Sequence, residues 1–432
     1  MTLRNIDDLS TMRLGVLVSH PIQYYAPLFR LLARHVELQV FYATNASPAQ
    51  QAKAGFGVEF EWDVDLLSGY NHTLLKNVSP DPGPNRFAGC DTPGIRREIE
   101  AGRFEAFVVF GWYLKAHWQA IRACRRLGVP LLVRGDSQLR GPRPILKSLG
   151  KEVTHRLALR QFDGFLAVGT RNREYLLHYG AAPSRIFSSP HFVDNEWFAT
   201  QAKAARDKRG EVRRRLGIPS DAFCIAFCGK FIPRKRPLDL VRAAQLLIST
   251  HGITKDSPRR VHLLFIGSGE LGPELRRNCN VVFDAENAVR PNEQQSIDIA
   301  APTASFVGFR NQTELPSYYV CSDVLVLPSD GTETWGLVVN EGMACGLPAV
   351  VSDAVGCAPD MIDDGQTGFT FGFRDFEALA RWLRQVMEQS QNGFDFVGPT
   401  RLKLTHYSVE AAAAGIVEGA GAVRAATRAH SR

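Results

Sequence analysis

The sequence predicts an α/β protein built from two domains, each around a parallel β-sheet. Short apolar runs alternate with amphipathic segments along the whole chain, which is typical of parallel sheets covered by helices. The length of 432 residues exceeds one ordinary hydrophobic core and indicates two or three domains. An apolar fraction of 45% with 22% charged residues is that of a globular chain.

The first half of the chain carries apolar runs that predict strands, each followed by a turn and a helical segment. These runs are residues 13–19, 37–42, 107–110, 131–134 and 164–168. Each is short and bounded by turn residues, as expected for strands buried on both faces of a parallel sheet. Residues 45–92 are rich in Gly, Pro and Asn and lack a period, so we expect an irregular insertion there.

The second half repeats this alternation. Strands are predicted at residues 225–228, 261–266 and 323–327. A basic helix over 201–216, a loop over 278–304 and an Ala-rich helix over 408–428 complete the pattern. The predicted organisation is a first domain of residues 1–195, a second domain of residues 196–404 and a C-terminal helical segment of residues 405–432.

Two glutamates frame the most informative stretch, residues 333–341. The apolar run 323–327 predicts a buried strand, which the turn residues 328–331 end. A helix is expected to begin near Gly336, so that Glu333 lies in the turn and Glu341 in the opening helix. A helix N-terminus presents unpaired N–H groups and binds anions. Two carboxylates beside it suit a ligand that carries both phosphate and sugar hydroxyls.

This stretch resembles the E-x7-E signature of retaining glycosyltransferases of family 4, which have the GT-B fold, and residues 342–352 are similar to its continuation. The resemblance implies two Rossmann-like domains facing a central cleft. The first binds the acceptor, the second binds the nucleotide sugar, and the last helix returns to the first. It also implies that Glu333 contacts the donor sugar, that Glu341 contacts the ribose, and that the N–H groups near Gly336 and Leu337 bind the diphosphate.

A basic turn supports the same interpretation. Residues 229–237 follow a predicted strand and precede an amphipathic helix, and cations at such a turn would neutralise a diphosphate. The turn is similar to the family's G-R-x5-K motif, which places Gly229, Lys230 and Lys235 at the motif positions. Lys230 departs from the family's Arg, because it keeps the charge but loses the bidentate fork. The alternative is a solvated basic loop.

A glycine-rich turn leaves a second function open. Residues 267–272 match G-x-G-x-x-G after a predicted strand, and Glu286 stands where a dinucleotide fingerprint has its ribose-binding acid. This pattern would suit a nicotinamide-dependent oxidoreductase. The fingerprint normally belongs to the first strand of its domain, which the basic turn occupies here. The family resemblance instead assigns Gly267 and Gly269 to the nucleotide site.

The run 305–310 resembles the family's F-x-G strand end, near which the nucleoside base lies, and includes Gly308. The alternative is an ordinary strand end. On the acceptor side, His20 and Asp136 each follow a predicted strand and are candidates for orienting or deprotonating the acceptor hydroxyl. The turn that contains His20 looks like the start of bacterial surface-polysaccharide glycosyltransferases.

The net charge of +7 is concentrated in residues 122–160. Such a region suits an anionic membrane surface or an acidic lipid-linked acceptor, and the alternative is a solvated basic face. No aromatic interleaving or known module indicates nucleic-acid binding. Residues 1–12 lack the features of a secretion signal, and Met12 is a second candidate start. The cysteine spacing indicates buried thiols rather than a metal site, which favours a cytoplasmic setting.

The sequence therefore predicts a retaining glycosyltransferase that moves a hexose-type sugar from a nucleotide-sugar donor to a hydroxyl of a glycan or lipid-linked acceptor. The resemblance implies a role in cell-surface polysaccharide biosynthesis and a location in the cytoplasm or on the inner face of its membrane. We expect neither a metal nor another cofactor, because lysines take the metal's place at the diphosphate. The alternatives are the oxidoreductase and a non-catalytic sugar-nucleotide-binding subunit.

Overall fold

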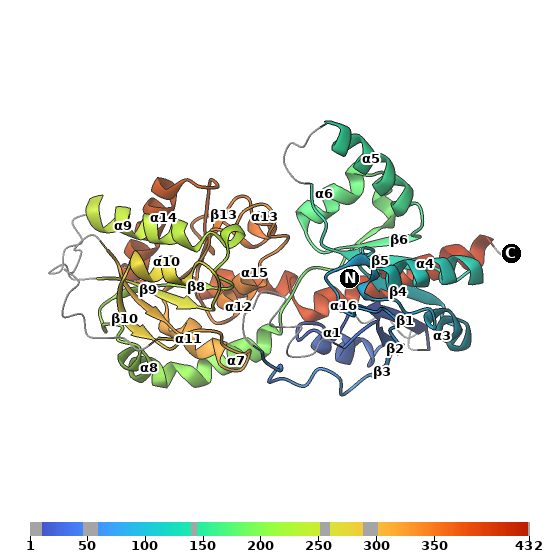
Figure 1. Cartoon of the computed structure of the whole chain (residues 1–432), viewed down its shortest axis with the longest axis horizontal. Coiled ribbons are helices and arrows are strands. Elements are labelled where there is room, and N and C mark those ends of the chain that lie inside the picture. The colour runs from blue at the N-terminus through green and yellow to red at the C-terminus, as the bar shows by residue number, and fades with distance from the viewer. Residues whose placement is uncertain (1–10, 46–58, 140–144, 251–259, 288–300, 431–432) are drawn as a thin grey trace. The chain divides into compact units, whose positions relative to one another are not determined.

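The computed structural model describes residues 11–45, 59–139, 145–250, 260–287 and 301–430. Its contacts divide the chain into two compact units. The N-terminal unit comprises Met1–Gln50, Val64–Phe192 and Tyr407–Arg432, and the C-terminal unit comprises Gln51–Asp63 and Val193–His406. Each unit contains one seven-stranded sheet (Figure 1).

The sheet of the N-terminal unit has the order β3-β2-β1-β4-β5-β6-β7, and its strand pairs are parallel. The central strand β1 (Arg13–Val18) is buried from its second residue on, which its apolar sequence explains. The other strands are β2 (Glu37–Tyr42), β3 (Asn71–Leu74), β4 (Ala106–Phe110), β5 (Leu131–Gly135), β6 (Gly164–Ala167) and β7 (Ile186–Ser188).

Helices cover both faces of this sheet. The elements are α1 (Tyr25–Leu32), the 3₁₀ turn η3 (Phe87–Gly89), α3 (Ile95–Gly102), α4 (Lys115–Leu127), α5 (Ile145–Leu159), α6 (Thr170–His178), η4 (Pro183–Arg185) and α16 (Val409–His430). One face packs against α1 and α16, and the other packs against α3, α4 and α6. Small residues let α16 approach closely, since a Cβ atom on Gly415 would lie 1.7 Å from the backbone oxygen of Ser188.

The sheet of the C-terminal unit has the order β10-β11-β9-β8-β12-β13-β14 and is also parallel. Its strands are β8 (Phe223–Cys228), β9 (Val261–Ile266), β10 (Asn280–Asp284), β11 (Thr303–Phe306), β12 (Val324–Leu327), β13 (Ala349–Ser352) and β14 (Gly368–Phe371). The helices are α7 (Asn195–Ala205), η5 (Arg206–Lys208), α8 (Arg209–Arg215), η6 (Pro233–Lys235), α9 (Pro237–Thr250), α10 (Gly272–Arg277), α11 (Leu315–Cys321), α12 (Leu337–Ala344), α13 (Ala358–Met361), α14 (Phe376–Gln391) and α15 (Val397–His406).

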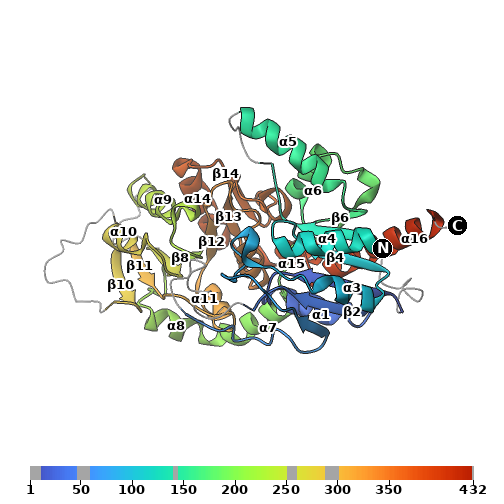
Figure 2. The same ribbon diagram turned by 45° about the vertical axis from the view of Figure 1, so that its right-hand side comes forward.

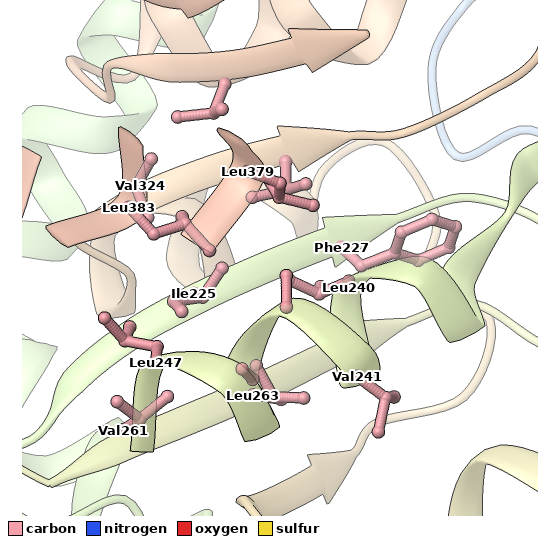
Figure 3. Close-up of a cluster of buried hydrophobic side chains, with 14 of the residues drawn as sticks. Ile225, Phe227, Leu240, Val241, Leu247, Val261, Leu263, Val324, Leu379 and Leu383 are labelled. Atoms are coloured by element: carbon pink, nitrogen blue, oxygen red, sulfur yellow. The ribbon is translucent and has the colours of Figure 1, made fainter. Parts of the chain in front are cut away.

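The core of the C-terminal unit lies between its sheet and helices. Figures 1 and 2 show α9 and α14 on one face and α8 and α11 on the other. In Figure 3, Ile225 and Phe227 of β8 meet Leu240 of α9 and Leu379 of α14. All four side chains are fully buried, so they fix the start of the sheet on which the following loops rest.

Three local predictions were wrong. The predicted loop 278–304 contains β10 and the start of β11, although residues 288–300 lie outside the described part. The expected irregular insertion 45–92 contains β3, while residues 46–58 lie outside the described part. Both missed strands are sheet edges with exposed positions, so they lack a continuous apolar pattern. The expected helix 201–216 is divided into α7 and α8 by η5.

Both sheets start at a central strand and change direction beside it. The chain leaves β8 for β9 on one side and later adds β12 on the other side of β8, and β1 has the same relation to β2 and β4. Ligands of open α/β sheets bind beyond the carboxyl ends of the strands at such switch points. In the C-terminal unit, this places the loops after β8 and β12 at the expected ligand site.

Candidate functional site

The loops after β8 and β12 contact each other at the switch point. The backbone N–H of Asp330 donates a hydrogen bond of 2.9 Å to the carbonyl oxygen of Arg234. The ammonium of Lys235 forms an ion pair with the carboxylate of Glu333, and their side chains are 12% and 16% exposed. The structure therefore brings together a cation and a carboxylate that the sequence places almost 100 residues apart.

Lys230 adds a second cation whose charge is costly to keep. Burial, followed by repulsion from Arg234 and Lys235, lowers the pKa of Lys230 to about 8, and Glu333 opposes this only in part. Arg236 does not contribute to the cluster, because both of its donors bind the carboxylate of Asp239 at 2.7 and 2.8 Å. Two lysines with one carboxylate between them form a site that an anionic ligand would relieve.

We expect the affinity for a nucleoside diphosphate to fall as the pH rises above about 8. A bound anion raises the pKa of Lys230, so binding requires proton uptake only where free Lys230 has lost its proton. Below about pH 8 the lysine is charged in both states, and this group contributes no pH dependence. Calorimetric titration between pH 7.5 and 9.5 measures the effect.

Lys230→Arg is the matched control, because a guanidinium stays protonated throughout this range. Its affinity is expected to be flat where the affinity of the wild type declines. A wild-type affinity that does not change from pH 7.5 to 9.5 contradicts the assignment of Lys230 to the anion site.

Glu341 lies in the second turn of α12 and is almost fully buried. Its side chain is 2% exposed, and its Oε2 accepts a hydrogen bond of 2.6 Å from the hydroxyl of Tyr319 on α11. Gly336 stands before α12 with a φ of 99° and no side-chain cap, so the first N–H groups of the helix, including that of Leu337, are not occupied by a capping side chain. The helix start thus retains its preference for an anion.

The turn that carries Glu333 is held from behind by the residues after β13. The N–H of Gly356 donates to the carbonyl oxygen of Glu333 at 3.0 Å, and the N–H of Cys357 donates to Trp335 at 3.1 Å. A Cβ atom on residue 356 would lie 1.8 Å from the carbonyl oxygen of Thr334. Only glycine fits there without displacing the turn.

Gly356→Ala is therefore expected to destabilise the fold by about 1–3 kcal/mol, as overpacking does, and to lower turnover by moving Glu333. Urea unfolding together with kinetics checks both effects. Gly331→Ala is the control, because the nearest atom to its added Cβ would be 3.8 Å away. Equal stability of the two variants would contradict this role of Gly356.

Three glycines lie side by side where β8, β9 and β11 end. The N–H of Gly229 donates to Ile266, and that of Gly267 donates to Gly308. A Cβ atom on Gly267 would lie 2.1 Å from the Gly229 oxygen, and one on Gly269 would lie 2.7 Å from the Phe231 oxygen. Close backbone packing thus accounts for the glycine-rich turn by itself.

The acid of the alternative dinucleotide fingerprint is already engaged. Arg276 binds Glu286 at 2.9 Å and holds Asp284 with two donors. The turn also follows β9, which lies beside the central strand rather than at the centre. Both observations disfavour the dinucleotide interpretation of residues 267–272.

The candidate acceptor residues lie in the N-terminal unit. His20 follows β1, and its Nδ1 lies 2.9 Å from the Ser19 hydroxyl oxygen. Burial lowers the pKa of His20 to about 4, so the imidazole is neutral near pH 7 and able to accept a proton. Asp136 follows β5 and is exposed. Both residues lie at carboxyl ends of strands in the same sheet.

The basic stretch 122–160 is not one continuous surface. Arg134 is buried: it donates to the carbonyl oxygens of Ser189 and Pro190, and its guanidinium lies 5.4 Å from the ring centre of Phe110. Arg125 and Arg156 bind carboxylates. Arg140 and Arg143 lie outside the described residues, as does the side chain of Lys147.

Metal and membrane features were searched within the described residues only. No group of three or more His, Cys, Asp or Glu side chains arranged for a metal ion was found among them. Among the same residues, no helix combines the length and the apolar character needed to cross a membrane.

Comparison with known proteins identifies the family. Residues 208–403 match the family described as glycosyl transferases group 1. The D-inositol 3-phosphate glycosyltransferase 1 of Catenulispora acidiphila is 31% identical over 345 residues, which are 75% of this chain and 74% of that protein. The chain belongs to the group 1 glycosyltransferases. Another relative of this group 1 chain, the D-inositol 3-phosphate glycosyltransferase of Thermomonospora curvata, is 31% identical over 288 residues, and the match covers 65% of this chain and only 61% of that protein.

Solved structures confirm the predicted fold class of this group 1 glycosyltransferase, two parallel-sheet α/β units with GT-B neighbours. HepE of Anabaena in complex with UDP and glucose gives a TM-score of 0.60 at 14% identity, covering 94% of this chain and 98% of that one. An α,α-trehalose-phosphate synthase (UDP-forming) from Burkholderia vietnamiensis gives 0.68 at 13% identity, covering 97% and 99%.

Sequence reasoning missed Tyr319, Cys228 and Gly356 as parts of the site. The tyrosine and the glycine act through contacts with other elements, so no local spacing marks them. Cys228 immediately precedes the basic turn, and this position was its only signal.

Proposed function

We propose that this group 1 glycosyltransferase transfers a hexose-type sugar from a nucleoside diphosphate sugar to a hydroxyl group with retention of the anomeric configuration. The observation that carries the proposal is the Lys235–Glu333 pair, with Lys230 beside it, at the switch point between β8 and β12. A lysine pair suits the diphosphate, and a partly exposed carboxylate suits the sugar hydroxyls.

The mechanism assigns each group a task during departure of the diphosphate. Negative charge grows on the diphosphate oxygens as the glycosidic bond breaks, and Lys230, Lys235 and the α12 N–H groups stabilise that charge. Glu333 accepts hydrogen bonds from the sugar, and Glu341 accepts them from the ribose. The acceptor attacks from the face that the diphosphate leaves, and the diphosphate helps to take its proton. No side chain acts as nucleophile.

We propose that the N-terminal unit binds the acceptor, with His20 and Asp136 orienting its hydroxyl. The neutral imidazole of His20 supports this role. We propose a glycan or lipid-linked acceptor of cell-surface polysaccharide synthesis. The relatives named as D-inositol 3-phosphate glycosyltransferases make that phosphate the second acceptor to test.

A panel of nucleotide sugars tests the proposal directly. Thermal shift selects the donor, and turnover is then measured with lipid-linked glycans and D-inositol 3-phosphate. Nuclear magnetic resonance of the product reads the anomeric configuration. We expect retention and full activity in excess chelator, because lysines take the metal's role. Inversion, or activity lost to chelator and restored by magnesium or manganese, would refute this mechanism, and binding without turnover would support the non-catalytic subunit.

We further propose that the N-terminal unit docks on an anionic membrane surface. Arg122, Arg126 and Arg160 are exposed, and the apolar side chains of Val153 and Leu157 on α5 are 58% and 52% exposed. Basic residues near such a surface each contribute about 1 kcal/mol, and apolar side chains add insertion. Sedimentation with anionic vesicles is therefore expected to fall as salt rises.

The triple variant Arg122→Glu, Arg126→Glu, Arg160→Glu is expected to release the protein from vesicles with its thermal stability nearly unchanged, because exposed charges contribute little to folding. Neutral vesicles are the control. Equal sedimentation with neutral and anionic lipids would leave a solvated basic face as the better interpretation.

A further inference from the structure

We propose that Tyr319 is a positioning residue that presents Glu341 to the ribose of the donor. Its hydroxyl occupies one oxygen of the carboxylate and leaves the other oxygen for the ribose hydroxyls. This inference rests on the proposed function, because it takes Glu341 as the ribose-binding carboxylate.

The contact between the two side chains is short and shielded from water. Tyr319 is fully buried on α11, Glu341 is 2% exposed on α12, and the phenol oxygen lies 2.6 Å from Glu341 Oε2. A hydrogen bond to a carboxylate is stronger than one between neutral groups, and a fixed partner limits the rotation of the carboxylate. The bond therefore determines which oxygen Glu341 offers to a ligand.

Cys228 holds the phenol from the other side. The thiol and the phenol share a hydrogen bond, and Cys228 is the last residue of β8, directly before the basic turn. Burial raises the pKa of Cys228 to about 12 and that of Tyr319 well above its usual value, so both groups keep their protons. Tyr319 is thus a permanent donor, and the trio connects β8, α11 and α12.

This arrangement predicts discrimination between ribose and deoxyribose. With Oε2 occupied by the phenol, Oε1 is the acceptor for a ribose hydroxyl, and a 2′-deoxy or 3′-deoxy ligand lacks one of the partners it can meet. A purely structural Tyr319 would satisfy a buried carboxylate and affect folding alone. Sugar discrimination separates these two roles, because stability alone does not alter it.

Tyr319→Phe is the test, read by calorimetric binding. UDP, GDP and ADP are titrated first, and the tightest of them is compared with its 2′-deoxy and 3′-deoxy forms. Loss of the hydroxyl is expected to weaken binding of the ribonucleotide about tenfold, as for one hydrogen bond to a charged group. Binding of the deoxy form whose missing hydroxyl meets Glu341 changes little, so the ratio collapses toward one. In kinetics, KM rises more than kcat falls.

Tyr318→Phe is the matched control on the neighbouring residue. The ring of Tyr318 lies 5.5 Å from the guanidinium of Arg310, a contact that phenylalanine keeps, so affinity and discrimination should stay at wild-type values. In a Glu341→Ala background, Tyr319→Phe should add no further loss, because the phenol acts through the carboxylate. If Tyr319→Phe does not fold, Cys228→Ala removes the second contact of the phenol and is expected to lower the discrimination in part.

Two outcomes overturn the inference while the proposed function stands. One is a wild type that binds the diphosphate without preferring ribose. The other is Tyr319→Phe, or Cys228→Ala in its place, with a lower melting temperature but the wild-type ratio of ribose to deoxyribose binding. A wild type that binds none of the three diphosphates overturns the proposed function itself.

Discussion

Replacing Lys235 by alanine is expected to lower kcat/KM by about 10²–10³-fold, or roughly 2.7–4 kcal/mol of transition-state stabilisation, as loss of one donor to a developing charge does. The side chain is only 12% exposed and is paired with Glu333, so its charge acts where water screens it weakly. Without it, Glu333 adds an uncompensated negative charge to the site where the diphosphate leaves. Single-turnover kinetics on the identified donor measures the effect.

Two variants of the same turn control for this result. Lys235→Arg keeps the charge with a different shape and is expected to recover part of the loss. Arg234→Ala removes an exposed charge from the same turn, and solvent screening makes its effect small. Melting temperatures show whether the fold is intact. Activity of Lys235→Ala within tenfold of the wild type would contradict the role of this lysine.

Glu333→Ala and Glu341→Ala are expected to separate turnover from binding. Glu333 lies in the turn beside the lysines and is proposed to contact the sugar, so its loss should lower kcat roughly 10²-fold while the affinity for the free nucleoside diphosphate changes little. Glu341 is proposed to contact the ribose, so its loss should weaken the diphosphate itself by about tenfold. Binding and kinetics measured on both variants test the split.

The free diphosphate is the internal control in this comparison, because it lacks the sugar that Glu333 would contact. Glu333→Gln keeps the shape and removes the charge, and it should fall between wild type and alanine. Wild-type kinetics in both alanine variants, or the reverse division of effects, would refute the assignments of the two carboxylates.

The sequence was sufficient where local pattern and chemistry coincide. The turn after β12 has a buried strand before it, glycine in it and a helix after it, so the positions of Glu333 and Glu341 could be predicted from the chain alone. The ion pair between Lys235 and Glu333 could not, because it depends on β8 and β12 being neighbours in the sheet. Neighbouring strands are set by topology, which no residue spacing displays.

Edge strands and buried polar groups were the parts that local reasoning failed to place. β3 and β10 are exposed on one side, so their sequences lack the apolar continuity of the inner strands. Arg134 was counted as surface charge, yet backbone carbonyl oxygens and three aromatic rings, those of Tyr25, Phe110 and Phe192, surround it. Burial of an arginine depends on such partners, which come from distant segments.

The position of α16 sets a time order for folding on the ribosome. The first sheet is synthesised early, but the helix that covers Leu14, Val16 and Leu132 is the last element to be made. At about 5–20 residues per second, roughly 240 further residues after Phe192 keep that apolar face waiting for about 10–50 s. The nascent N-terminal unit therefore remains a chaperone client until translation ends, whereas the C-terminal unit can complete its own core first.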